Sequence, residues 1–117
     1  KTLFVDTSND THIGSNTGAD KSGTYTCPTS FNASNATKLQ LSVMGHHEDS
    51  PTMGVYLVGS ASGTATSSTL VGTKSVPGET TAGGKTTYTF DISSFTGTRY
   101  VHLTTTCRLY IIEIKYV

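Results

Sequence analysis

Apolar residues in this chain occur in short segments, which clusters of Gly, Ser and Thr separate at fairly even spacing. No segment carries an apolar stripe with the 3.6-residue period of a helix over a useful length. Residues 38–45 alternate instead, because the apolar side chains of Leu39, Leu41 and Val43 are separated by polar ones. A strand that is buried on one side has this pattern. The segmentation therefore predicts an all-β domain.

Eight segments fit strands, and the turn residues between them suit two sheets in which each covers the inner face of the other. We expect an antiparallel β-sandwich of the jelly-roll type with about eight strands. Segment 53–59 has apolar groups on both faces, and the last segment is rich in Ile and Tyr, so both are expected inside a sheet. The expected strands are residues 3–6, 24–27, 38–45, 53–59, 69–76, 86–92, 99–103 and 108–117.

The length of 117 residues is enough for one core and too small for two. We expect a single domain over residues 1–117. Because the chain begins at Lys1 without an initiator Met or a signal segment, we expect it to be excised from a larger multidomain protein. The composition supports the β assignment, with 23 Thr and 14 Ser and only 14% charged residues.

Charge and hydropathy exclude two classes of partner. Eight basic and eight acidic residues cancel, so the chain lacks the excess positive charge of a nucleic-acid binder. No apolar run exceeds four residues, as in residues 109–112, whereas a membrane span needs about 20. We therefore expect neither nucleic acid nor a membrane as a partner.

The two cysteines leave two interpretations open. Cys27 and Cys107 are far apart in the sequence and do not have the spacing of a metal-binding or redox pair. They form either the disulfide of a secreted protein or two unrelated thiols of a β domain. A bond between them would join the strand that ends before Pro28 to the start of the closing strand.

Oxygen donors gather where the first strand ends. Asp6, Asn9 and Asp10 are hard ligands of the kind that calcium prefers, although the twelve-residue calcium loop signature is absent. Asn and Asp are also common in turns because they tolerate unusual backbone angles. A structural calcium ion and an Asx-rich turn are the two interpretations.

The segment His46-His47-Glu48-Asp49 follows the strand at residues 38–45 and collects four polar, metal-capable side chains. Adjacent residues of a strand point in opposite directions, and the i, i+4 pair of a helical zinc site is absent. The segment is a solvated loop, a ligand-binding loop or a metal site.

Tyrosine can stack on a sugar ring while its hydroxyl stays hydrated, so outward tyrosines on a sheet are candidate ligand contacts. Tyr100 is the strongest, because Arg99, His102 and Arg108 are near it in the last two strands and guanidinium groups bind carboxylates or paired hydroxyls. Tyrosines that are buried or that cover a sheet edge are the more ordinary interpretation. The three candidates are Tyr56, Tyr100 and Tyr110.

Residues 86–103, followed by residues 108–117, resemble the ending of galactose-binding-like jelly-roll carbohydrate-binding modules of secreted polysaccharidases. In that family a strand ending near an Asp leads through a Gly turn to a Tyr-x-x-Leu strand, as it does here between Asp91 and Leu103. Similar endings occur on phage tail adhesion domains.

The resemblance implies that the closing strand pairs with the first strand. It also implies calcium held between N-terminal acidic residues and an acidic residue of the closing strand, and here Asp6 and Glu113 occupy comparable positions. Family members often use Trp as a sugar platform, and this chain has none.

The expected function is that of a non-catalytic, extracellular carbohydrate-binding module that targets a polysaccharide-degrading enzyme to a plant-type or microbial polysaccharide. The glycan is either acidic, as pectic chains are, or neutral, and the module is expected to be a monomer. An adhesion or structural domain of a phage tail or bacterial surface protein is the alternative. An enzyme is disfavoured, because nothing in the sequence places two carboxylates at the separation that glycoside hydrolysis needs.

Overall fold

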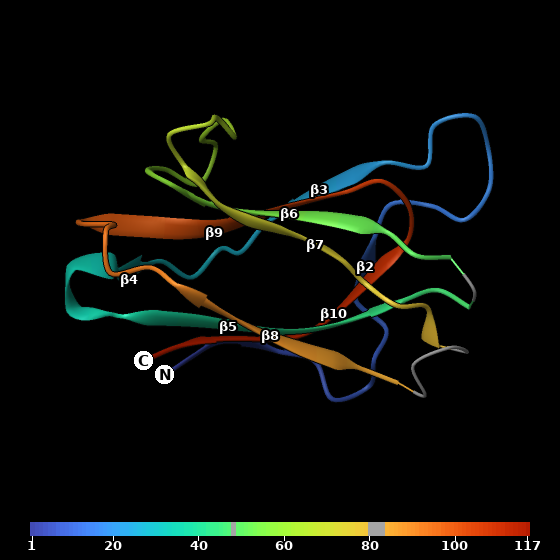
Figure 1. Cartoon of the computed structure of the whole chain (residues 1–117), viewed down its shortest axis with the longest axis horizontal. Helices are drawn as coiled ribbons and strands as arrows, with labels where there is room; N and C mark the ends of the chain where they lie inside the picture. Colours follow the sequence, from blue (N-terminus) through green and yellow to red (C-terminus); the bar gives the residue numbers. More distant parts are fainter. Residues whose placement is uncertain (48, 80–83) are drawn as a thin grey trace.

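The computed structural model describes residues 1–47, 49–79 and 84–117, in which ten strands form two antiparallel sheets packed face to face (Figure 1). Sheet I has the order β1 (Thr2–Val5), β10 (Leu109–Tyr116), β5 (Lys38–Gly45) and β8 (Thr86–Asp91), and β2 (His12–Ile13) also pairs with β10. Sheet II has the order β3 (Gly23–Thr26), β9 (Thr98–Thr105), β6 (Thr52–Val58) and β7 (Leu70–Ser75). Strand β4 (Phe31–Asn32) also pairs with β9 and precedes a short 3-10 helix, η1 (Ala33–Asn35).

The predicted β-sandwich is confirmed, and each of the eight expected segments contains a strand. Strands β10 and β6 both lie between two neighbours, as their apolar character on both faces indicates. The closing strand pairs with the first strand, with Val5 opposite Glu113. The two further strands, β2 and β4, have two residues each, which is too short to show an alternating pattern.

The core lies between the sheets and is built from the alternating inner positions of four central strands. Facing residues from the two sheets are removed completely from solvent, which is the main stabilising contribution in a domain of this size. The fully buried members from these strands include Leu39, Leu41, Val43, Val55, Leu57, Val101, Leu103, Leu109, Ile111 and Ile114.

A β-bulge interrupts the alternation in β10. Ile111 is opposite Val43 and Glu113 is opposite Ser42, so Ile112 is an extra residue on the β10 side. Because of this insertion Ile111 and Ile114 both face the core, whereas Ile112 is outside the core cluster and lies on the outer face of sheet I. The bulge therefore adds a large apolar side chain to the outer face, which also carries Met44.

Cys27 and Cys107 are free thiols, so the disulfide interpretation is wrong. The Cys27 N–H donates to the carbonyl of Val101, whereas Cys107 follows the far end of β9 at Thr105. The part of β9 between Val101 and Thr105 alone spans about 13 Å, and a disulfide needs Cα atoms within about 7 Å. The thiol of Cys27 is buried and donates to the Leu3 carbonyl at 3.7 Å.

Among the described residues, no helix is long and apolar enough to cross a membrane.

Replacing Ile111 by Ala is expected to lower the free energy of unfolding by about 2 to 5 kcal/mol, because it leaves a cavity in the core. Val117→Ala is the control, since the Val117 side chain is 74% exposed. Urea denaturation of both variants measures the difference. Equal urea midpoints for Ile111→Ala and the wild type would contradict the placement of Ile111 on the core-facing side of β10.

Alkylation without reductant is expected to modify both cysteines after unfolding, and Cys107 before Cys27 in the native protein, because Cys27 is fully buried. Mass spectrometry of the labelled protein measures this. An unlabelled product that is lighter by two hydrogen atoms would contradict the free-thiol structure.

Candidate functional site

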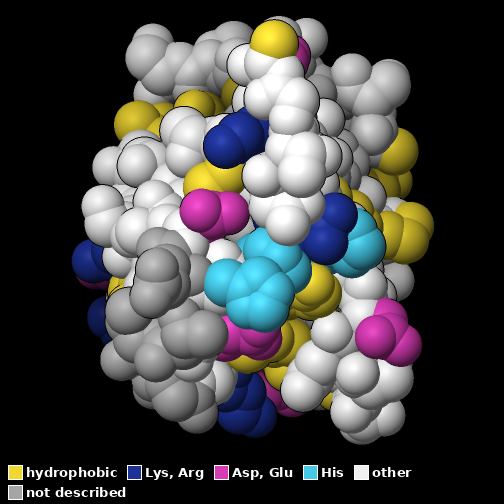
Figure 2. Space-filling view, turned by 90° about the vertical axis from the view of Figure 1, so that its right-hand side faces the viewer, with side chains coloured by type: hydrophobic (Ala, Val, Ile, Leu, Met, Phe, Trp, Pro, Cys, Tyr) yellow, Lys and Arg dark blue, Asp and Glu magenta, His cyan; other side chains and the backbone are white. Residues whose placement is uncertain are grey.

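Three histidines and a tyrosine form a row of rings at the end of the sandwich where β5 ends and β10 begins; we call this the histidine end. Tyr110 of β10 is opposite His12 of β2, and their ring centroids are 5.3 Å apart. The Tyr110 ring is 6.0 Å from that of His46, which is 3.9 Å from that of His47. Figure 2 looks onto this end and shows histidine side chains gathered near its centre, beside acidic and basic groups.

The backbone at His47 explains why two adjacent histidine rings lie together. His47 has φ 49°, in the left-handed region that few non-glycine residues adopt. The Asp49 N–H donates to the His46 carbonyl at 2.9 Å and closes a turn. The expectation that adjacent side chains point in opposite directions therefore does not apply here, because it holds only for extended backbone.

A second loop is held against this turn by backbone contacts. The Gly45 N–H donates to the Pro77 carbonyl at 3.1 Å, and Gly45 forms a parallel bridge with Gly78. A Cβ atom on Gly78 would lie 1.9 Å from the His47 carbonyl oxygen, so only glycine fits. This close approach brings Glu79 to the histidines, and its Oε1 lies 3.5 Å from Nδ1 of His47.

The electrostatic surroundings favour the neutral form of His46. Partial burial lowers its pKa, and the neighbouring charges of His47 and Arg108 lower it further, while Glu79 and Asp49 oppose the shift. The Tyr110 hydroxyl lies 3.3 Å from Nδ1 of His46. The buried Nε of Arg108 has no hydrogen-bond partner in the described part of the chain.

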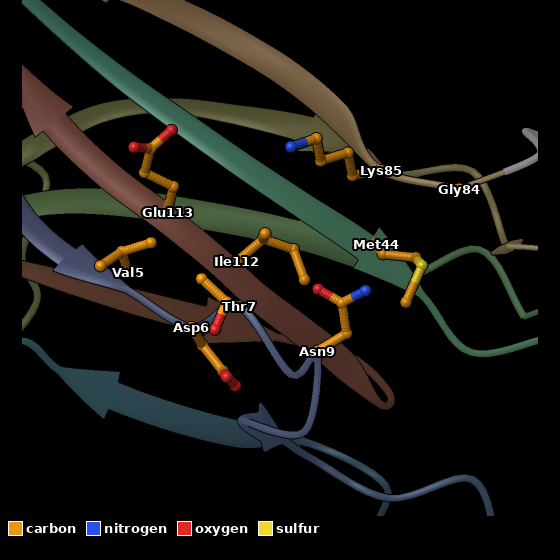
Figure 3. A pocket seen from close by; sticks show the side chains of 9 residues that line it. All are labelled: Val5, Asp6, Thr7, Asn9, Met44, Gly84, Lys85, Ile112 and Glu113. Atoms are coloured by element: carbon orange, nitrogen blue, oxygen red, sulfur yellow. The ribbon is translucent and has the colours of Figure 1, made fainter.

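A pocket of about 520 Å³ lies on the outer face of sheet I (Figure 3). Met44 and Ile112 give it an apolar floor, and Asn9, Lys85 and Glu113 give it polar groups at the edge. The full lining is Val5, Asp6, Thr7, Asn9, Met44, Gly84, Lys85, Ile112 and Glu113. Because Met44 is directly opposite Tyr110 in the sheet, the pocket adjoins the row of rings.

The carboxylate of Asp6 closes the turn after β1. Its Oδ1 accepts hydrogen bonds from the N–H and the hydroxyl of Ser8, and its Oδ2 accepts from the N–H groups of Asp10 and Thr11. These hydrogen bonds hold the pKa of Asp6 well below its usual value of 3.8. Both oxygens of this carboxylate are therefore used within the turn, as the Asx-rich turn interpretation predicts.

The calcium candidates Asp6, Asn9, Asp10 and Glu113 do not form a ligand set among the described residues. Figure 3 shows the carboxylates of Asp6 and Glu113 pointing in opposite directions, and Glu113 lies 4.0 Å from the ammonium of Lys115. The carboxylate oxygens of Asp6 already accept hydrogen bonds from backbone N–H groups and a hydroxyl group, so these residues do not fit calcium as the family resemblance implies.

Tyr56, Tyr100 and His102 share the outer face of sheet II, as the alternation of β9 predicts. Tyr56 is opposite His102, with ring centroids 6.1 Å apart, and Tyr100 is opposite Val58. The hydroxyl of Thr26 lies 2.7 Å from Nδ1 of His102, and burial lowers the pKa of that histidine. This surface is a second candidate for a ligand.

The two arginines do not join Tyr100. Nη1 of Arg99 donates to the Leu57 carbonyl and its Nε to the Thr96 carbonyl, both at 2.9 Å, while its guanidinium lies 5.2 Å from the Phe95 ring centroid. Arg108 lies beside His46 at the histidine end. The group inferred from neighbouring sequence positions is thus divided, because β9 carries the chain from one end of the sandwich to the other.

Pairing across the sheets brings in residues that sequence reasoning missed. His12 and Glu79 join the histidine end, and Met44, Lys85 and Ile112 line the pocket. Each comes from a different element, and a local pattern indicates only Met44 among them. A longer alternation test would identify Met44 as the outward residue after Gln40 and Ser42.

Neither protein-family models nor curated proteins match the sequence. Solved structures do match. A family 6 carbohydrate-binding module studied for its binding sub-sites has 17% identity and a TM-score of 0.55, over 91% of this chain and 79% of that one. CsCBM6-3 from Clostridium stercorarium, solved in complex with cellobiose, has 22% identity and a TM-score of 0.55, over 97% of this chain and 78% of that one. The chain therefore has the galactose-binding-like fold of these modules.

Asp6→Asn is expected to destabilise the domain at pH 7, because an amide cannot accept all four hydrogen bonds. The pKa of Asp6 is lowered on folding, so the stabilisation by its carboxylate is present above the unfolded value of 3.8 and is lost as the pH falls toward the folded pKa. The free energies of unfolding of Asp6→Asn and the wild type, measured by urea denaturation, should therefore become more alike as the pH falls from 7 to 3.

Asp10→Asn is the matched control, because its backbone N–H, and not its carboxylate, takes part in this turn. If the free energy of unfolding differs between Asp6→Asn and the wild type by the same amount across this pH range, the role of the Asp6 carboxylate is contradicted.

Proposed function

We propose that this chain is a non-catalytic carbohydrate-binding module, and that it binds a polysaccharide on the outer face of sheet I. The fold likeness to modules of this class supports the proposal, and one of them was solved with a bound disaccharide. Binding alone can hold an attached enzyme near its substrate and raise the effective concentration without any chemistry in the module.

The observation that carries the proposal is the pocket beside Tyr110. A sugar ring has an apolar C–H face and a rim of hydroxyl groups, so it needs an apolar surface with a few polar groups at its edge. Met44 and Ile112 supply the surface, Asn9 and Glu113 supply hydrogen-bonding groups, and the adjoining Tyr110 ring extends the platform.

The charges at the pocket support a neutral glycan. Lys85 and Glu113 have opposite signs, so the lining has no excess of positive charge with which to select a polyanion. An acidic chain would depend on ammonium and guanidinium groups, and its affinity would fall steeply as salt rises. A neutral chain depends on stacking and hydrogen bonds, which salt screens little.

The hydrogen bonds and the ion pair of the carboxylates near the pocket also support binding rather than catalysis. Asp6 is used by four hydrogen bonds, and Glu113 is paired with Lys115 on the exposed face of β10. We propose in addition that the module acts outside the cell as part of a longer polysaccharide-degrading protein. The free cysteines do not contribute to that argument, which rests on the fold likeness.

Tyr110→Ala is expected to weaken polysaccharide binding by about tenfold, or about 1.4 kcal/mol, because it removes the aromatic part of the platform. Affinity electrophoresis in gels containing a neutral β-glucan, xylan or pectin, at low and high salt, measures this effect. A neutral ligand should retard the wild type equally at both salt concentrations.

Tyr100→Ala is the matched control, since Tyr100 is a tyrosine on the outer face of the other sheet. If Tyr100→Ala abolishes binding and Tyr110→Ala does not, the site lies on sheet II, with Tyr56 and His102. If the wild type binds no polysaccharide, an adhesion or structural role replaces the proposed function.

A further inference from the structure

The side chains of His46, His47 and Glu79 converge at the histidine end. One ring nitrogen of each histidine and one carboxylate oxygen of Glu79 all lie within 4.8 Å of one another. Two imidazoles and one carboxylate are a ligand set that binds zinc and related divalent transition metals, with further positions left to water or a ligand. We propose that these three residues form a binding site for a divalent transition metal of the zinc class.

The distances require only a small inward movement. Zinc bonds to nitrogen and oxygen are about 2.1 Å long, so two ligand atoms on one tetrahedral ion are about 3.4 Å apart. The side chains of His47 and Glu79 are 64% and 34% exposed, and they can rotate toward the ion without disturbing the core. Their closest approach is already 3.5 Å.

The backbone holds the two loops together before any ion binds. The Gly45–Gly78 bridge and the Gly45–Pro77 hydrogen bond fix residues 45 and 77–78 against each other. The Ser50 hydroxyl donates to the Val76 carbonyl at 3.0 Å and ties the same loops at a second point. The entropy cost of bringing Glu79 to the histidines therefore belongs to the folding of the domain, and metal binding does not incur it again.

Groups around the cluster also suit a metal ion. The Tyr110 hydroxyl contacts Nδ1 of His46, and coordination through the other nitrogen, Nε2, keeps this hydrogen bond and fixes the ring. The charges of Asp49 and Glu79 attract a cation, and they oppose the repulsion from Arg108.

The test titrates the purified chain with Zn²⁺ in isothermal calorimetry and with Co²⁺ in absorption spectroscopy, and it uses Ca²⁺ as the hard-cation comparison. We expect one Zn²⁺ per chain, visible d–d bands for Co²⁺ and no competition by Ca²⁺. No glycan is present, so the result does not depend on the proposed carbohydrate binding.

Two variants remove one ligand each. His47→Asn keeps a residue that tolerates the left-handed backbone, and Glu79→Gln keeps the shape of the side chain. Each is expected to weaken Zn²⁺ binding more than about a hundredfold, because losing an outer-shell partner alone typically costs 10–100-fold. Tyr110→Phe, which removes such a partner of His46, is expected to cost less than either.

His12→Ala is the matched control, since His12 belongs to the same row of rings but not to the cluster. It should leave Zn²⁺ affinity within about twofold of the wild type. Absence of one-to-one binding in the folded wild type overturns the proposal. Equal losses in His12→Ala and His47→Asn also overturn it, because they indicate weak binding to scattered surface histidines. Circular dichroism of each variant confirms that it is folded.

Discussion

The pairing of β10 inside sheet I is the constraint on which most of this structure depends. It is hydrogen-bonded to β1 and β2 on one side and to β5 on the other, so it joins both ends of the chain. Its bulge turns Ile111 and Ile114 inward and leaves Ile112 on the outer face. An unbulged strand would alternate strictly, and Ile111 and Ile114 would then face opposite sides. One inserted residue thus completes the core and also supplies part of the pocket's apolar floor, which Met44 of β5 completes.

The histidine end depends on a different constraint, which is the close approach of two loops. The contact between Gly78 and the His47 carbonyl leaves no space for a side chain, and the left-handed His47 turns its ring toward His46. A non-glycine residue with positive φ is a locally unfavourable conformation that the surrounding contacts must offset. Here the backbone bridge and the hydroxyl of Ser50 offset it. The strained residue is also one of the proposed metal ligands.

Much of the fold follows from the alternation of polar and apolar residues, because each sheet has one buried face and a period of two identifies strands. Val101 and Leu103 are buried and Tyr100 and His102 are on the outer face, as that period predicts. The same alternation does not predict which residues meet at the candidate site. Arg108 is near Tyr100 in the sequence but packs at the histidine end, since a strand separates sequence neighbours by about 3.3 Å per residue. Glu79 reaches the histidines only through a tertiary contact, which no local pattern encodes.

The two proposed sites meet at Tyr110, but they depend on different parts of that residue. Its ring adjoins the pocket through Met44, whereas its hydroxyl contacts His46. A sugar that stacks on the ring needs the apolar face, and a metal bound to His46 gains only from the hydrogen bond at the rim. Loss of the hydroxyl therefore acts on the metal site, while loss of the ring acts on both. The two functions can be separated by substitution for this reason. Binding at one site nevertheless fixes Tyr110, which the other site also uses. If the metal changes the affinity for the sugar, the sugar must change the affinity for the metal by the same factor.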